Sequence, residues 1–174
     1  NADDADLRLF NMRGRVRTNK AQWSEADKDS VDRLAFYAPA RWRKSSAESA
    51  ANFSAVAWHF GRTLRDSLKV PVGIICNAVG GSGAESWVDI DVLAENMPDV
   101  LVDWRNNDYL QPWVQQRAGE NTGTDKNHRH PYEPSYLFAS GVKPLGHLPL
   151  AGVIWYQGES NAQNIEVHES LFPL

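Results

Sequence analysis

Two short polar segments carry the residues of this chain that are best suited to chemistry. The first, Gly80–Trp87, begins with the run Gly-Gly-Ser-Gly, and the second, Gln157–Ala162, begins with Gln-Gly-Glu-Ser-Asn. Glycine lets backbone N–H groups approach a ligand without side-chain obstruction, and such groups can hold a phosphate or a developing oxyanion. The side-chain amides of Gln157 and Asn161 could complete an oxyanion hole, the set of donors that stabilises the tetrahedral intermediate of acyl transfer.

Simpler interpretations of both segments stay open at this level. The glycine run does not have the GxGxxG spacing of a dinucleotide site, and no Walker lysine follows it, so it could be a plain tight turn after a strand. Ser160 or Asn161 could cap the next helix. Binding of a phosphate by the N–H groups of the glycine turn is a further alternative.

A serine in these segments could act as a nucleophile only with a base within hydrogen-bond reach. His147 precedes an apolar run and is therefore expected at the opposite edge of the sheet. Only His128 and His130, in a long polar loop, could swing toward the local serines, which are Ser82, Ser86 and Ser160. Contact with a substrate is the favoured role for His128 and its neighbour Arg129.

Two apolar runs lead into the polar segments and are expected to place them together. Val72–Val79 and Leu150–Tyr156 are apolar on both faces, as strands of a buried parallel sheet must be. An amphipathic helix over residues 53–68, stopped by Pro71, precedes the first run. Ligands of open parallel sheets bind just past the carboxyl ends of the strands, so both polar segments should lie at one edge.

The remaining elements complete an α/β pattern. The sequence predicts a strand at Leu7–Met12, a loop over Thr18–Asp32, helices at Asp89–Trp104 (broken at Pro98) and at Tyr109–Arg117 as its extension, a polar loop over Gly119–Tyr132, and a short helix at Tyr136–Leu145. The order of helix, strand, helices and strand favours a parallel sheet with helices on both faces.

Composition excludes several classes of function. The 174 residues carry a net charge of −4 without a basic cluster, so neither a nucleic acid nor an anionic membrane is expected as a partner. No apolar run reaches the roughly 18 residues of a membrane span. The single cysteine, Cys76, cannot form an internal disulfide, and no Cys/His spacing indicates a metal site. Seven tryptophans leave open a carbohydrate-binding module that stacks sugars on its indoles.

The second polar segment and its surroundings resemble a known family. Val153–Ala162, which reads VIWYQGESNA, is similar to the signature block of the sialate O-acetylesterase and acetylxylan-esterase-like branch of SGNH hydrolases. The segments Phe53–Trp58, Val70–Ile75 and Gly80–Trp87 resemble the same family in the same order, so the resemblance covers roughly Leu34 to Leu174. It implies a three-layer α/β/α flavodoxin-like fold, with 1–174 as a single partial domain, and a cofactor-free serine esterase acting on acetylated sugars.

The resemblance also implies roles for individual residues. Gly81, or its neighbour Gly80, would supply a backbone N–H to the oxyanion, and Gln157 or else Asn161 would supply a side-chain amide. Glu159 would support the two loops. Gly80 and Ser82 of the glycine turn, with His128 and Arg129, are the predicted substrate contacts.

Two blocks expected by resemblance are absent. The chain contains neither the Gly-Gln-Ser-Asn block that carries the family's nucleophile nor an Asp-x-x-His near its end. The expectation is therefore that segments of the same domain before and after this chain supply the serine and the histidine. A first strand from such a segment would lie between Leu7–Met12 and Val72–Val79, so that this chain alone would fold poorly. Family habit points to a periplasmic or secreted protein.

Overall fold

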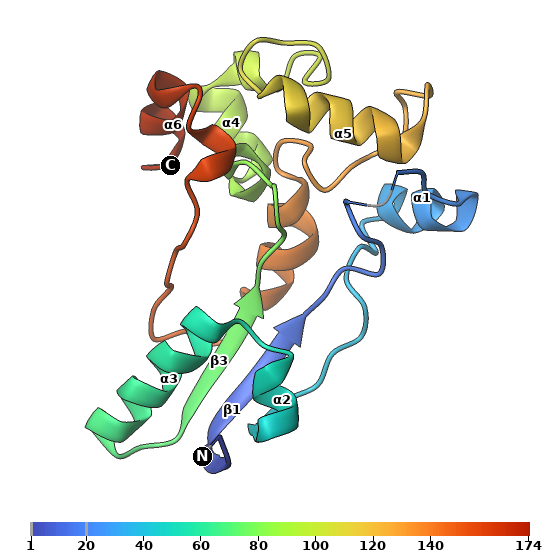
Figure 1. Cartoon of the computed structure of the whole chain (residues 1–174). Helices are drawn as coiled ribbons and strands as arrows, with labels where there is room; N and C mark the ends of the chain where they lie inside the picture. The colour runs from blue at the N-terminus through green and yellow to red at the C-terminus, as the bar shows by residue number, and fades with distance from the viewer. Residues whose placement is uncertain (1, 20) are drawn as a thin grey trace. The chain divides into compact units, whose positions relative to one another are not determined.

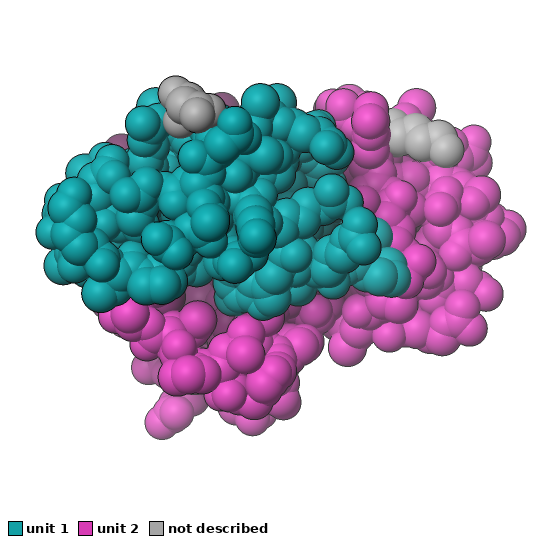
Figure 2. Space-filling model, turned by 90° about the horizontal axis from the view of Figure 1, so that it is seen from below, with its two compact units in different colours: residues 1–13, 38–78 teal, residues 14–37, 79–174 magenta. Residues whose placement is uncertain are grey.

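The computed structural model describes residues 2–19 and 21–174 and has a mixed α/β architecture (Figure 1). Its contacts divide the chain into two compact units, residues 1–13 with 38–78 and residues 14–37 with 79–174 (Figure 2). The first unit holds the sheet, and the second holds both polar segments and most of the short helices. The single domain over 1–174 that the sequence suggested stays a prediction.

The first unit is a three-stranded sheet with two helices. Its elements are β1 (Asp4–Met12), β2 (Arg43–Ser45), α2 (Ala47–Ala51), α3 (Ala55–Leu68) and β3 (Val72–Asn77), and the strand order is β2-β1-β3. The strands and the long helix that were predicted here are confirmed. In α3, Gly61 lies against the sheet so closely that an added Cβ would come within 2.6 Å of Ile74 and 3.2 Å of Leu7.

The pairing of the strands corrects one expectation. β1 and β3 are direct parallel neighbours, in register from Leu7 opposite Val72 to Met12 opposite Asn77, while β2 pairs antiparallel on the other side of β1. No further strand therefore fits between β1 and β3, because their backbone groups already hydrogen-bond to each other. The apolar pattern of β3 is typical of a central strand, but it does not specify which strand is the neighbour.

The second unit contains the short helices. They are α1 (Glu25–Asp32), α4 (Ile90–Asn96), α5 (Pro112–Thr122) and α6 (Ile165–Leu171), with 3-10 turns at Ala84–Trp87, Pro98–Val100, Lys143–Leu145 and Glu159–Asn161 and a π-helix at Phe138–Val142. The helix broken at Pro98 and the helical segment near Tyr136 are confirmed. Three apolar clusters form its core, and Tyr136, Leu137, Leu93 and Val114 are among their fully buried members.

Two predicted loops are in part helical. Thr18–Asp32 ends in α1, which begins at a capping box formed by Ser24 and Asp27 and buries Val31. The polar composition concealed this helix, because its stability comes from the cap and a single buried face. α5 is a separate helix with Pro112 in its first turn, rather than an extension of α4, and it runs into the predicted loop as far as Thr122.

The predicted strand Leu150–Tyr156 is wrong for the described chain. These residues form no strand, and Val153 and Tyr156 are 79 % and 84 % exposed. A strand needs a hydrogen-bonded neighbour, and all three described strands belong to the other unit. An apolar sequence indicates a capacity to pair, and the partner must be supplied by the tertiary structure.

Candidate active site

The glycine run forms a β-turn that only glycine can complete. Ser82 N–H donates to the carbonyl oxygen of Val79 at 3.2 Å, and the third residue of the turn, Gly81, has φ 83°. A turn with a positive φ at this position favours glycine, since any Cβ is strained there. An added Cβ would also lie 2.6 Å from the Tyr132 hydroxyl, whereas at Gly80 it would meet nothing within 4 Å.

The hydroxyl of Ser82 is committed to holding this loop. Ser82 is 4 % exposed, and its Oγ donates to the Val79 carbonyl at 2.8 Å and accepts the indole N–H of Trp87 at 2.9 Å. The side chain therefore joins the turn to the 3-10 turn that follows it. Its direct contact with a substrate stays a prediction.

Asn161 joins the two polar segments. Its Oδ1 accepts the backbone N–H of Ala84 at 2.9 Å and the side-chain amide of Gln157 at 2.7 Å, and its Nδ2 donates to Glu85 at 3.0 Å. Asn161 is 5 % exposed, so these contacts are shielded from water. The expectation that the two segments meet is confirmed by these hydrogen bonds, although one of the strands that was to bring them together is absent.

The buried acid of the site is Glu85. It is 3 % exposed, and burial raises the pKa of its carboxyl, against the opposing effect of the Asn161 amide. Gly83 makes room for it, because a Cβ there would lie 2.1 Å from Glu85 Oε1. Glu159, by contrast, is exposed and makes no side-chain hydrogen bond within the described chain. Glu85, and not Glu159, is the carboxyl that accepts the Asn161 amide in the structure, and the support of the two loops by Glu159 stays a prediction.

The hydrogen bonds distinguish the two candidate amides. The orientation of the Asn161 amide is fixed because its Oδ1 must face the Ala84 N–H, and the side chain is only 5 % exposed. Gln157 must present its Nε2 to Asn161 Oδ1, which uses one of the two amide hydrogens and leaves the other. Gln157 is also the more exposed of the two residues. Of the two amides, Gln157 is therefore the one available to a ligand.

Sequence reasoning missed the aromatic side chains that pack against Gly81. Tyr132 donates its hydroxyl to the Gly80 carbonyl at 2.8 Å and packs edge-on against Trp113 at 5.9 Å between ring centroids. Tyr132 N–H in turn donates to His130 Nδ1 at 3.0 Å. Tyr132 lies 52 positions from Gly80 in the sequence, so no local pattern marks the contact.

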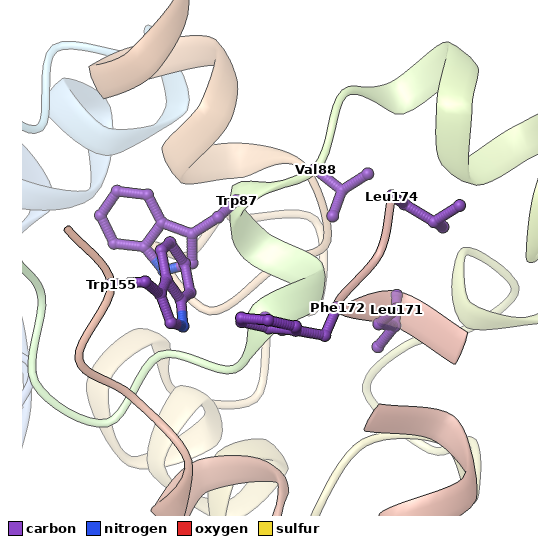
Figure 3. Close-up of a pocket in the computed structure, with 7 residues that line it drawn as sticks. Trp87, Val88, Trp155, Leu171, Phe172 and Leu174 are labelled. Atoms are coloured by element: carbon purple, nitrogen blue, oxygen red, sulfur yellow. The ribbon is translucent and has the colours of Figure 1, made fainter. Parts of the chain in front are cut away.

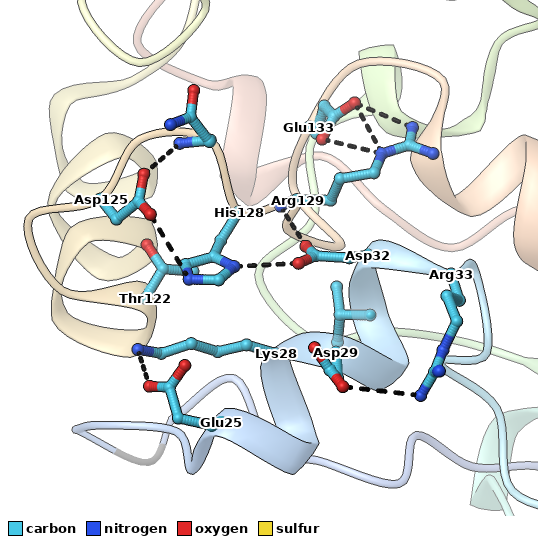
Figure 4. A network of polar contacts seen from close by, with 12 residues as sticks. Glu25, Lys28, Asp29, Asp32, Arg33, Thr122, Asp125, His128, Arg129 and Glu133 are labelled. Carbon is cyan, nitrogen blue, oxygen red and sulfur yellow. Dashed lines mark hydrogen bonds and ion pairs between the residues drawn. The ribbon is translucent and has the colours of Figure 1, made fainter.

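His128 and Arg129 belong to a separate polar network that attaches their loop to α1 (Figure 4). His128 Nδ1 lies 2.9 Å from Asp32 Oδ2, and the backbone N–H of Arg129 donates to the other oxygen of Asp32 at 2.7 Å. The Arg129 guanidinium pairs with Glu133 at 2.8 Å and lies over the Tyr136 ring. The structure therefore gives both side chains partners within the protein, and their contact with a substrate stays a prediction.

An apolar pocket adjoins the second segment (Figure 3). It has a volume of about 170 Å³ and is lined by Ala84, Trp87, Val88, Trp155, Leu171, Phe172 and Leu174. The Trp87 and Trp155 rings meet edge to face at 6.0 Å, as the close-up shows. Trp87 thus connects the glycine turn, through Ser82, to the pocket wall.

No described serine of the two segments has a histidine partner. His130 is fully buried, and burial, followed by the charges of Arg105 and Arg117, holds its pKa well below the usual range. Ser86 Oγ is buried without a hydrogen-bond partner in the described residues. Within the same residues, no group of three or more His, Cys, Asp or Glu side chains is arranged to hold a metal ion, and no helix is long and apolar enough to cross a membrane.

The curated proteins that are similar to this chain carry one name. No protein-family model matches the chain. The sialate O-acetylesterase of Rattus norvegicus is 33 % identical over 96 % of this chain and 31 % of its own length. The sialate O-acetylesterases of Mus musculus and Homo sapiens are 32 % and 29 % identical over 76 % of this chain, and 27 % and 23 % of their lengths.

A solved structure agrees with these relatives. A carbohydrate acetylesterase from Xanthomonas citri superposes with a TM-score of 0.57 and 26 % identity, over 92 % of this chain and 27 % of that protein. The chain thus spans between about a quarter and a third of the length of the proteins that it matches.

Proposed function

We propose, from the premise that this chain belongs to the sialate O-acetylesterase family, that the protein it forms part of is a carbohydrate O-acetylesterase. In the proposed reaction a serine attacks the acetyl carbonyl carbon, and its hydroxyl proton passes to a histidine and then to the departing sugar oxygen. Water then hydrolyses the acetyl-enzyme, which releases acetate and restores the serine. No cofactor takes part.

This chain contributes the oxyanion hole to that reaction. The observation that carries the proposal is the spare amide hydrogen of Gln157, held in place by the buried Asn161 that also anchors the glycine loop. Gly81 offers the second donor, because its N–H makes no hydrogen bond to another described residue. Two preorganised donors are what a developing acetyl oxyanion requires.

The nucleophile and the base come, in this proposal, from other segments of the same domain. The 174 residues contain no Gly-Gln-Ser-Asn block and no Asp-x-x-His near the end, and the described serines have no histidine partner. Acetylated sialic acid is the first substrate to test, because the relatives are named for it, and acetylated xylan is the second. An exported location, periplasmic or secreted, suits either polymer-bound sugar.

Acetate release by the full-length protein tests the proposal. We expect hydrolysis of 9-O-acetylated sialic acid or acetylated xylan, and a fall in kcat of about 10²- to 10³-fold in Gln157→Ala with little change in KM. Gln163→Ala, at an exposed glutamine directly after this segment, is the matched control and should retain activity. Binding of sugar without acetate release would instead support a carbohydrate-binding module and overturn the proposal.

A fluorophosphonate probe locates the nucleophile independently. The adduct is expected on a serine outside the 174 residues. An adduct on Ser82, Ser86 or Ser160 would show that this chain carries its own nucleophile, and the assignment of its loops to the oxyanion hole alone would then be wrong.

A further inference from the structure

The Tyr132 hydroxyl contacts one peptide group of the glycine turn. It donates to the Gly80 carbonyl oxygen at 2.8 Å, and the peptide that joins Gly80 to Gly81 is trans. In a trans peptide the C=O and N–H groups point in opposite directions. The Gly81 N–H therefore points away from Tyr132, and it makes no hydrogen bond to another described residue.

Tyr132 is itself held in one position. Its ring is buried in the cluster with Val100, Leu110 and Val114 and packs edge-on against Trp113. Its backbone N–H donates to His130 Nδ1, which fixes the His130 tautomer, since the other ring nitrogen must then carry the proton. Burial also raises the pKa of the Tyr132 hydroxyl, so that it remains a donor at neutral pH.

The alternative direction of the peptide is accessible without Tyr132. A turn whose two central residues are both glycine tolerates either orientation of the peptide between them, because neither residue has a Cβ to restrict φ. The reversed orientation would turn the carbonyl oxygen toward the ligand in place of the N–H group. A lone pair there would repel the oxyanion that the N–H stabilises.

We propose that Tyr132 is a positioning residue for catalysis: by bonding the Gly80 carbonyl it aims the Gly81 N–H at the oxyanion. The proposal rests on the proposed esterase function. Tyr132 touches neither the substrate nor the reacting atoms, and it acts through the peptide plane. Its removal should thus weaken stabilisation of the transition state and leave ground-state binding of the sugar unchanged.

Tyr132→Phe in the full-length protein tests this, because it removes the hydroxyl and keeps the ring. We expect kcat and kcat/KM to fall together, about 10- to 100-fold, with KM within about twofold of the wild type. Inhibition by an alkylboronic acid, which forms a tetrahedral adduct with the serine, should weaken by the same factor. A purely structural role would shift the melting temperature without producing this matched loss.

Tyr136→Phe is the control, since the Tyr136 hydroxyl also donates to a backbone carbonyl, that of Val31 at 2.7 Å, within a separate cluster. It should lose stability and keep kcat. An active wild type whose kcat is unchanged in Tyr132→Phe would overturn the positioning role alone. A wild type that releases no acetate, while its circular dichroism shows a folded protein, would overturn the proposed function and the positioning role with it.

Discussion

Replacing Asn161 by alanine should disconnect the two polar segments. The substitution leaves the Ala84 N–H and the Glu85 carboxyl buried without their partner, while the half-buried Gln157 amide can turn toward water. Each buried polar group that loses its partner costs about 1–3 kcal/mol. The two together predict a loss of about 3 kcal/mol in the free energy of unfolding, which corresponds to about 6–12 °C in Tm for a domain of this size.

Urea unfolding of the full-length protein, followed by tryptophan fluorescence, measures this loss. Asn96→Ala is the control, because Asn96 is exposed and bonds only its own helix, and it should stay within about 0.5 kcal/mol of the wild type. If Asn161→Ala cost less than about 1 kcal/mol, the three hydrogen bonds of Asn161 could not be joining the segments, and the reasoning would fail.

Asn161→Asp examines the same contacts without a change of size. The introduced carboxyl can still accept the Ala84 N–H, and it places a second acid beside Glu85. Two adjacent buried carboxyls share one proton, so the native state of the variant binds protons more tightly than the unfolded state does. The difference in the free energy of unfolding between the variant and the wild type should therefore be smallest near pH 4–5. The variant should become the less stable of the two by a growing margin as pH rises. A deficit independent of pH would contradict this.

Three further outcomes follow from individual contacts. Gly81→Ala adds a Cβ at a residue with φ 83°, close to the Tyr132 hydroxyl, so it should lower kcat about 100-fold and the free energy of unfolding by about 1–2 kcal/mol. Gly80→Ala is the control and should leave urea unfolding unchanged, because its Cβ meets nothing within 4 Å. Because the Glu85 pKa is raised above its unfolded value, the wild type should lose stability relative to Glu85→Gln as pH rises above about 4.5. If the free energies of unfolding of the two proteins changed equally with pH, the raised pKa of Glu85 would be wrong. Ser82→Ala removes the acceptor of the Trp87 indole N–H, so it should lower the free energy of unfolding by about 1–2 kcal/mol and shift the fluorescence emission of Trp87 in the folded protein. An unchanged emission spectrum would refute this prediction.

The local pattern of the sequence determined the elements with strong periodicity. The α3 helix, β1 and β3 were predictable because their apolar spacing and the nearby Pro71 act within a few residues. The same reasoning marked both polar segments and both candidate amides. It failed for α1, because the composition of this helix is polar and the Ser24 capping box marks its start.

Only the tertiary structure decided which residues meet. Pairing between β1 and β3, and the absence of a strand at Leu150–Tyr156, depend on which backbone lies alongside, and no residue of the segment itself carries that information. Within the site, the contact of Glu85 with Asn161 and the greater exposure of the Gln157 amide follow from burial and from the hydrogen bonds of Asn161. The sequence by itself thus determined which chemical groups are present, and the fold decided which of them are occupied, because occupancy depends on partners far away in the chain.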